Sequence, residues 1–253
     1  KQLSLWQPSL YPQGSRVTTI FLILASFLSS TLTAILGVGG GMLLISVMAV
    51  AMPPAAIVPV HGVAQLASNA SRGLFALKEI RWQIFWPFLV GCLLGSLVGS
   101  RLLIRFPAEF LPVPLGLFIL VMTWMPQLRK TFWLPGRFFS LGLVQAILTL
   151  FVGATGPLNM PFLLRAGLSR DQIVVTASAL MTLVHLIKIV TFGLLGFTFG
   201  VHLLLMAGMV IAVIAGSYSG SHARQRVPEE LFRKIFKGLI TLLALRMILK
   251  ALV

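Results

Sequence analysis

The chain has 253 residues, of which 58% are hydrophobic and only 10% are charged, with a mean hydropathy of +0.99. A soluble domain carries roughly 25% charged residues, so this composition excludes a soluble protein and predicts an all-α polytopic membrane protein. The net charge of +15 does not indicate nucleic-acid binding. Most of the cations fall between apolar runs, where they orient helices and meet anionic lipid head groups. A single cysteine, Cys92, excludes an intrachain disulfide and a thiolate metal cluster.

Apolar segments follow one another along the chain and divide it into two halves. Residues 1–16 form a polar N-terminal segment without the features of a cleavable signal peptide. The first transmembrane repeat, residues 17–125, has apolar runs at 17–36, 42–52, 55–77, 83–103 and 110–125. A linker at 126–136 precedes the second transmembrane repeat, residues 137–253, which has apolar runs at 138–152, 158–164, 171–195, 201–221 and 236–253.

One glycine motif occurs in both halves. GVGGG begins at Gly37, and a degenerate copy, GATGP, begins at Gly153, which is 116 positions later. The same offset maps Arg72 onto Lys188 without a gap. Many secondary transporters consist of two homologous halves, each containing a broken helix. The duplication therefore predicts two homologous transmembrane repeats.

The number of crossings in each half decides whether the repeats are parallel or inverted. If each glycine-broken segment crosses once, each half has four crossings, the repeats are parallel and the loop cations divide almost evenly. If each broken segment is a hairpin, each half crosses three times and the second half is inverted. Only Lys1, Arg16, Arg101, Arg105 and Lys250 then lie opposite the larger group of loop cations. Because cytoplasmic loops are rich in Lys and Arg, we favour inverted repeats with both termini outside, although residues 17–36 are long enough to span alone.

The glycine breaks form the first part of the predicted binding site. Backbone at membrane depth either lines a cavity or is buried in protein, and a helix start offers free N–H groups and a positive dipole end. Inverted symmetry would point two helix starts at each other and form a two-sided cradle for an anion. Close helix packing is the alternative role of these glycines. The candidate residues are Gly39, Gly40, Gly41, Met42, Thr155, Gly156, Leu158 and Asn159.

Two cations inside apolar segments, Arg72 and Lys188, form the second part. A charge at depth in a bilayer is costly unless it is paired or hydrated, so such residues are usually functional. Extension of both side chains to the near interface is the alternative. All five acidic residues lie in or near loops. Unpaired cations beside two helix starts therefore indicate an anionic substrate, and they argue against a sodium site.

Polar side chains on the same helix faces complete the candidate site. Asn69 and His185 lie one helical turn before the two cations, and His61 and Gln65 continue the stripe at intervals of four. We expect these residues to orient the anion. The histidines leave proton coupling open, and hydrogen-bonded structural histidines are the alternative.

Motifs for catalysis are missing from the sequence. It contains no HExxH motif and no phosphate-binding loop, and its four histidines are scattered. We therefore expect no enzymatic activity, no metal and no cofactor.

The chain resembles the sulfite exporter TauE/SafE family over about residues 17–253. The resemblance lies in GVGGG, in the second copy GATGPLNMPFLL, and in the polar helix with SNASRG in one half and HLIK in the other. It implies a multi-pass protein of the bacterial inner membrane that moves small sulfur oxyanions and organosulfonates, such as sulfite. We expect a secondary transporter that works by alternating access. An anion channel and a non-transporting scaffold are the alternatives. The sequence leaves the anion, the direction of transport, the coupling ion and homo-oligomerisation open.

Overall fold

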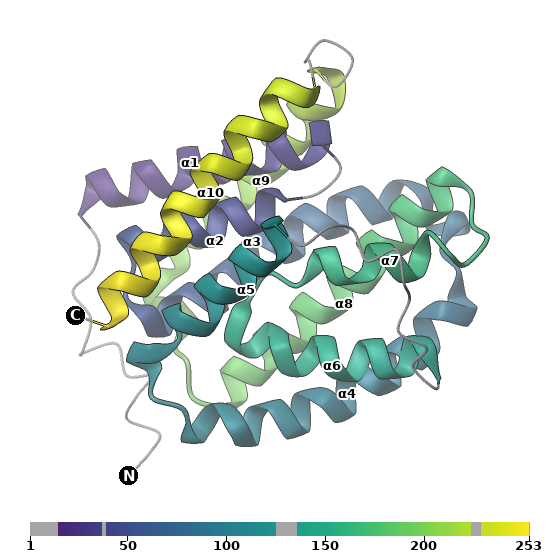
Figure 1. Cartoon of the computed structure of the whole chain (residues 1–253), viewed down its shortest axis with the longest axis horizontal. Coiled ribbons are helices and arrows are strands. Elements are labelled where there is room, and N and C mark those ends of the chain that lie inside the picture. Colours follow the sequence, from purple (N-terminus) through teal and green to yellow (C-terminus); the bar gives the residue numbers. More distant parts are fainter. Residues whose placement is uncertain (1–14, 37–38, 125–135, 224–228, 253) are drawn as a thin grey trace.

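The computed structural model describes residues 15–36, 39–124, 136–223 and 229–252, and every regular element within them is a helix (Figure 1). This confirms the predicted all-α class. The α-helices are α1 (Arg16–Leu36), α2 (Gly40–Ala51), α3 (Pro54–Gly73), α4 (Trp82–Arg105), α5 (Pro112–Trp124), α6 (Arg137–Val152), α7 (Met160–Leu163), α8 (Arg170–Leu194), α9 (Leu203–Ala223) and α10 (Glu229–Leu252). The 3₁₀ turns are η3 (Leu74–Glu79), η4 (Ala108–Phe110), η5 (Gly156–Asn159) and η6 (Phe199–His202). Most of the predicted N-terminal segment and linker lies outside the described residues.

Long apolar helices with outward-facing leucines indicate a membrane environment. Within the described residues, the segments long and apolar enough to cross a membrane are Arg16–Ile35, Trp82–Arg105, Asp171–Leu194 and Phe199–His222. They coincide with four of the predicted apolar runs. Leu204 is 83% exposed and Leu194 is 81% exposed, as a lipid-facing surface requires. The protein is therefore a multi-pass membrane protein.

The starts of the two central helices follow from local sequence. Pro54 takes the first position of α3, where a missing backbone N–H costs no hydrogen bond. At the start of α8, the Ser169 hydroxyl accepts from the backbone N–H of Gln172, and the Gln172 side chain accepts from the Ser169 backbone. This capping box satisfies free N–H groups of the first turn and fixes where α8 begins.

The chain turns back on itself at both glycine breaks. Gly39 precedes α2 with a φ of 102°, and Gly153 ends α6 with a φ of 70°. Residues with a side chain adopt such angles only at a cost. After the first turn, Gly40 packs against the Ser29 carbonyl of α1. After the second, the Thr155 carbonyl accepts from the side chain of Gln145 in α6.

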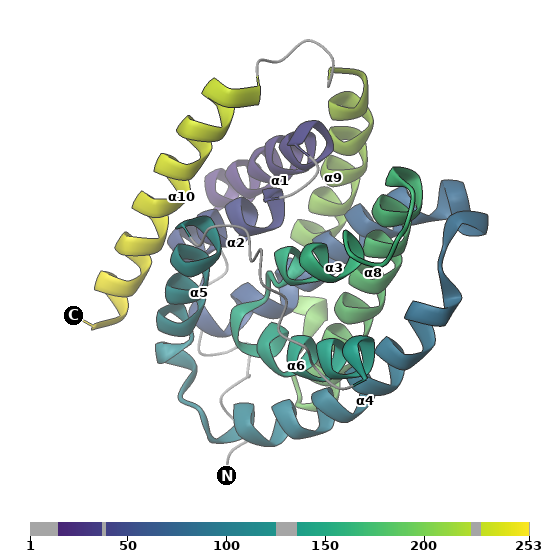
Figure 2. The same cartoon turned by 45° about the vertical axis from the view of Figure 1, so that its right-hand side comes forward.

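Buried apolar side chains form two clusters that divide the molecule. The larger cluster joins α1, α2, α3, α5, α9 and α10 with the last residues of α6 and α8. The smaller joins α4, α6, α7 and the first part of α8. Figure 2 shows α4 and α6 together on one side of the molecule and α1, α9 and α10 on another. The core is therefore divided, and α8 contributes to both parts.

Glycines allow two long helix pairs to pack closely. Gly91 and Gly95 of α4 lie against the backbone of α6, and Gly216 and Gly220 of α9 lie against the backbone of α1. Small residues at helical spacing permit such approach in membranes. The helical spacing of Gly91, Gly95 and Gly99 in one half, and of Gly208 and Gly216 in the other, predicts this packing role, and the contacts confirm it.

The two helices after the glycine breaks, α3 and α8, pack against each other antiparallel. Gly62 in the middle of α3 lies beside Lys188 late in α8, and Gly73 at the end of α3 lies beside Ser178 early in α8. The start of α3 at Pro54 and the start of α8 at residue 170 are separated by the same 116 positions as the glycine motifs.

The last helices of the two halves also run antiparallel. Gly116 of α5 lies beside Ile248 of α10. At the other end of α5, the Trp124 indole Nε1 donates to the Thr241 hydroxyl of α10 over 2.9 Å. Equivalent helices from the two halves therefore pair in opposite directions at two places.

Candidate functional site

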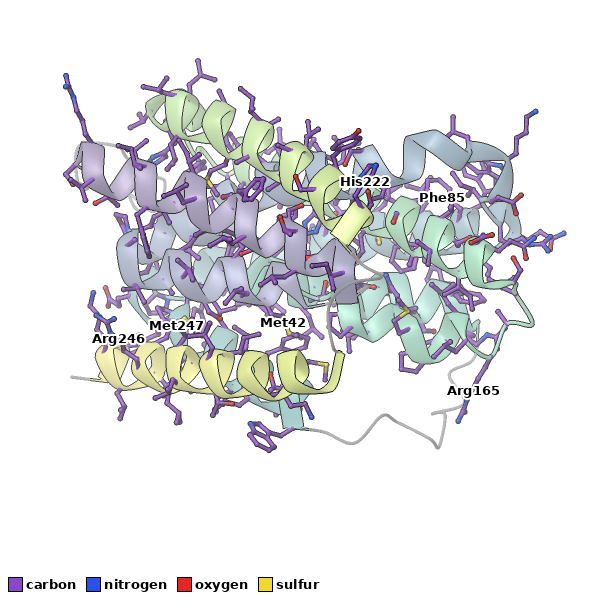
Figure 3. The ribbon with its side chains drawn as sticks, turned by 90° about the horizontal axis from the view of Figure 1, so that it is seen from above. Met42, Phe85, Arg165, His222, Arg246 and Met247 are labelled. Atoms are coloured by element: carbon purple, nitrogen blue, oxygen red, sulfur yellow. The ribbon has the colours of Figure 1, made fainter. Side chains whose placement is uncertain are left out.

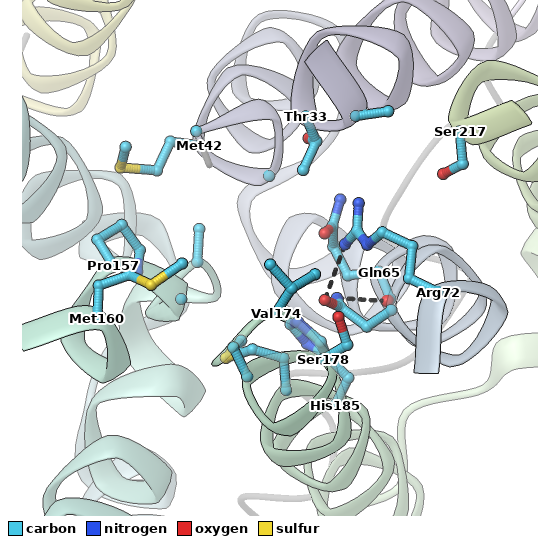
Figure 4. Close-up of a pocket in the computed structure, with 18 of the residues that line it drawn as sticks. Thr33, Met42, Gln65, Arg72, Pro157, Met160, Val174, Ser178, His185 and Ser217 are labelled. Atoms are coloured by element: carbon cyan, nitrogen blue, oxygen red, sulfur yellow. Dashed lines mark hydrogen bonds between the residues drawn. The ribbon is translucent and has the colours of Figure 1, made fainter. Parts of the chain in front are cut away.

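A cavity of about 310 Å³ lies where α1, α3, α8 and α9 meet the two glycine breaks. Figure 4 shows Arg72 of α3 reaching toward Gln65, with Pro157 and Met160 on one side and Ser217 on the other. The residues that line it are Thr33, Ala34, Gly39, Gly41, Met42, His61, Gln65, Asn69, Arg72, Ala154, Gly156, Pro157, Met160, Val174, Ala177, Ser178, Met181, His185, Ser217 and Ser221.

Both glycine breaks border this cavity, but they are built differently. The first break leads into α2, a helix of 12 residues that begins at Gly40. The second leads into the four-residue turn η5 and the four-residue helix α7. Pro157 and Pro161 occur within these short elements, and proline lacks the N–H that extends a regular helix. The two predicted helix starts therefore differ in the structure, since only α2 has an extended helix dipole at the cavity.

The polar side chains on one face of α3 line the cavity, and hydrogen bonds hold them in place. The His61 Nε2 lies 2.9 Å from the Gly41 carbonyl oxygen, so this nitrogen donates because a carbonyl only accepts. The Asn69 side chain donates to the Gln65 backbone carbonyl over 2.8 Å and accepts from the Arg72 Nη2 over 2.9 Å. The spacing predicted these residues on one face, and the structure places them there.

Several polar atoms at this site are buried without a partner among the described residues. They are the Arg72 Nη1, the His61 Nδ1 and the His185 Nδ1. The two histidine rings approach edge to face with their centroids 6.0 Å apart. Buried polar atoms are normally hydrogen-bonded, and this guanidinium nitrogen is a donor with no acceptor among the described residues. The site therefore retains unused capacity to donate to an oxyanion.

Lys188 lies next to the second glycine break, outside the lining of the cavity. Its side chain is 0% exposed, and its ammonium donates to the Gly153 carbonyl over 3.0 Å. Gly62 leaves room for it, because a Cβ at that position would lie 2.7 Å from the lysine Cε. Arg72 instead turns back along α3 and donates to the Asn69 side chain. The expectation that both cations face one cavity is wrong.

Other predicted site residues also lie outside the lining. Gly40 is packed against α1, and the Thr155 hydroxyl and carbonyl both accept from Gln145. Leu158 packs against the smaller apolar cluster. Asn159 is 0% exposed, and neither atom of its amide has a partner among the described residues.

Sequence reasoning missed the lining residues on the outer helices. Thr33, Ser217 and Ser221 lie in apolar segments of α1 and α9. Their hydroxyls resemble the many others in these helices that bond to a carbonyl one turn earlier, so residue type gave no signal. The sequence did offer a signal for Ser178, because the 116-residue offset makes it the equivalent of Gly62 in the first half. Gly37 and Val38 of the first motif lie outside the described residues.

The charges around the cavity are one-sided. Arg72 is the formal cation in the lining, and none of the lining residues is acidic. Asp171 and Glu109 are exposed elsewhere. Within the described part of the chain, no three His, Cys, Asp or Glu side chains converge as metal ligands. The arrangement can stabilise a small negative solute through one guanidinium, amide groups and hydroxyls.

Comparison with known proteins gives a family. No curated protein and no solved structure matches the chain. The model of the family described as sulfite exporter TauE/SafE matches residues 22–247, which include every residue that lines the cavity. Because this match covers nearly the whole sequence, the chain belongs to the sulfite exporter TauE/SafE family.

Proposed function

We propose that this protein is a secondary transporter that exports a small sulfur-containing anion, such as sulfite or an organosulfonate, across a bacterial inner membrane. The observation that carries the proposal is the buried Arg72 Nη1, which has no hydrogen-bond partner among the described residues and lies beside a cavity without acidic lining residues. A guanidinium presents several N–H donors in one plane and matches the oxygens of sulfite or a sulfonate. Family membership supports this class of substrate.

The size and lining of the cavity fit such a substrate. Ligand sites range upward from roughly 300 Å³, and the volume of about 310 Å³ suits a small solute. Arg72, Asn69 and Ser178 supply donors on one side, while Met42 and Met160 supply flexible apolar surface on the other. A sulfonate head would bind at Arg72, and a short organic tail would contact the methionines.

The packing of equivalent helices supports an inverted arrangement of the repeats. Because α3 and α8 run antiparallel, the two-fold axis that would relate them lies across the helices, in the plane of the membrane that α8 is long and apolar enough to cross. Arg165 and Arg246 lie at opposite ends of the molecule (Figure 3). The Arg165 end also carries the aromatic cluster of Trp82, Phe85 and Trp86, which is typical of a membrane interface.

We place the Arg165 end in the cytoplasm, because the larger group of loop cations in the sequence lies at that end under this arrangement. The cavity opens toward the same end. Val174, in the second turn of α8, is 43% exposed, and Ser221, in the last turn of α9, is exposed, whereas His61 is 0% exposed. This conformation would therefore receive its substrate from the cytoplasm, as an exporter does.

A closed floor favours a carrier over a channel. Beneath the cavity, Gly153 packs against Ile45 and Val58, which are 0% and 1% exposed. Lys188 fills the space beside them. A carrier in one of its access states has such a barrier on one side of its site. Saturation and counterflow of the anion would distinguish it from a channel.

Flux of labelled sulfite or methanesulfonate in proteoliposomes tests the proposal. Arg72→Gln removes the charge, and loss of a charged hydrogen bond of about 1.5–3 kcal/mol predicts a roughly ten-fold or larger loss of affinity. Arg105→Gln removes an exposed cation at the end of α4 and should leave flux unchanged. Equal flux in wild type and Arg72→Gln, or no flux of either anion in wild type, would contradict the proposal.

A further inference from the structure

We propose that Lys188 forms a second anion subsite, closed in this conformation, which opens to the opposite side of the membrane when the protein changes state. The proposal rests on the transport function proposed above and identifies the residues of the second access path. Arg72 and Lys188 would then bind the same anion in turn, each on its own side.

The two cations occupy equivalent places on α3 and α8. The offset that maps Arg72 onto Lys188 also maps Gly62 onto Ser178. In the structure, Lys188 lies beside Gly62. The equivalent pair, Arg72 and Ser178, borders the open cavity, with Ser178 beside Gly73 of the last turn of α3. The contact between α3 and α8 at Arg72 and Ser178 therefore borders the open cavity, whereas the equivalent contact at Lys188 and Gly62 is closely packed.

The closed side is held by contacts that a small movement would break. The Lys188 ammonium donates to the Gly153 carbonyl over 3.0 Å. A Cβ at Gly153 would meet Ile45 and would lie 3.6 Å from both Cγ atoms of Val58. Val58 is the equivalent of Val174, which is 43% exposed at the mouth of the open cavity. In the alternate state Val58 would occupy the mouth on the other side.

The described residues supply no negative charge beside Lys188. Among them, the titratable groups that interact with it are His61 of α3, on the other helix of the pair, and His185 of its own helix. Neither offers a negative charge. A neutral donor would hold the Gly153 carbonyl equally well, and an ammonium without a counter-ion is expensive in a membrane protein. An anion that reaches Lys188 in the other state explains why the position carries a charge.

Accessibility of two matched cysteines tests the change of state. Val58→Cys and Val174→Cys are made in a Cys92→Ala background, and each variant is first tested for sulfite flux. An impermeant maleimide then labels each from the outer and the inner face. We expect Val174→Cys to react from the inside and not from the outside, and Val58→Cys to react from the outside and not from the inside. Variants that transport sulfite while Val58→Cys stays unreactive from outside would overturn this proposal and leave the transport function standing.

Gly62→Ala provides a way to shift the equilibrium. The added methyl group crowds the Lys188 Cε, and an overpacking cost of about 1 kcal/mol against the closed packing predicts roughly five-fold faster labelling of Val58→Cys from outside. Gly73→Ala is the matched control, since its Cβ would meet only ordinary contacts at 3.8 and 4.0 Å, and it should not change the rate. Equal rates in the two variants would count against the proposed opening.

Protection by methanesulfonate, which does not react with maleimides as sulfite does, tests the subsite itself. In the Gly62→Ala background, methanesulfonate added outside should slow labelling of Val58→Cys by occupying the opened site. Lys188→Gln keeps a donor for the Gly153 carbonyl but removes the charge, and it should weaken this protection about ten-fold. Undiminished protection in Lys188→Gln would restrict Lys188 to holding the glycine break.

Discussion

The glycine-lined helix pairs, α4–α6 and α1–α9, and the central pair α3–α8 all pack closely, but the residues at their interfaces differ in polarity. Along α4–α6 and α1–α9, glycines bring backbones together and apolar side chains surround them. Along α3–α8, the contact contains a buried lysine, two histidines and one wall of the cavity. The apolar interfaces of the first kind are most stable when the two helices stay in contact. The second contains polar groups whose hydrogen bonds are incomplete.

The difference between the two kinds of interface also indicates which helices stay together when the protein changes conformation. Each glycine-lined pair joins one helix of the first half to one helix of the second, so the two halves are interlocked (Figure 1). A movement that separated the halves as blocks would break both pairs. We therefore expect the pairs to stay intact while the contacts of α3 and α8 change. The following predictions test this contrast, beginning with the tightest interface.

Gly91→Ala should have the largest effect. A Cβ at Gly91 would collide with the Phe139 carbonyl and lie 2.9 Å from the Leu143 backbone nitrogen, and backbone cannot move aside as a side chain can. We expect a loss of about 3 kcal/mol in unfolding free energy, visible as a lower Tm in detergent. Gly238→Ala makes the same chemical change where no atom lies within 4 Å. A Tm for Gly91→Ala equal to that of Gly238→Ala would show that this pair is not tightly packed.

The sequence predicted these tight pairs more successfully than it predicted the cavity. The spacing of glycines in apolar segments can be read directly from the sequence, so Gly91, Gly95 and Gly216 could be assigned to packing from the sequence. Helix boundaries near Pro54 and Ser169 also follow from local chemistry. Both kinds of feature are set within a few turns of one helix.

The cavity depends on contacts between helices, which the sequence does not specify. Arg72 and Lys188 are equivalent in the duplicated sequence, but a single conformation treats them differently: one borders the cavity and the other is covered by the Gly153 turn. A duplicated sequence cannot indicate which of two equivalent openings is open. The apolar run at 158–164 predicts one short helix, whereas the structure divides this stretch between η5 and α7, which contain Pro157 and Pro161.

Gly153→Ala should have an intermediate effect and test the closed floor of the cavity. Its φ of 70° is strained for alanine, and the new Cβ would collide with Ile45. Gly167→Ala has nearly the same φ, 68°, with nothing within 4 Å. Left-handed strain alone costs about 1–2 kcal/mol, so Gly167→Ala measures strain and Gly153→Ala measures strain plus crowding. We expect Gly153→Ala to be less stable than Gly167→Ala by about 1 kcal/mol in thermal unfolding. Equal losses would mean that the Gly153 turn is not packed against Ile45.

The smallest effect should come from a hydroxyl inside the α1–α9 pair. Ser30 of α1 donates to the Val213 carbonyl over 2.7 Å and lies 2.7 Å from the Ser217 hydroxyl of α9. The Ser30 hydroxyl also lies 3.2 Å from the Ser68 hydroxyl of α3. Ser30→Ala removes all three contacts and should lower the unfolding free energy by about 1 kcal/mol. Ser29, one position earlier, is also buried, and its hydroxyl has no partner among the described residues. Ser29→Ala should therefore be neutral or slightly stabilising. If both variants melt at the same temperature, hydrogen bonds contribute little to this pair, and its stability comes from the close approach at Gly216 and Gly220 alone.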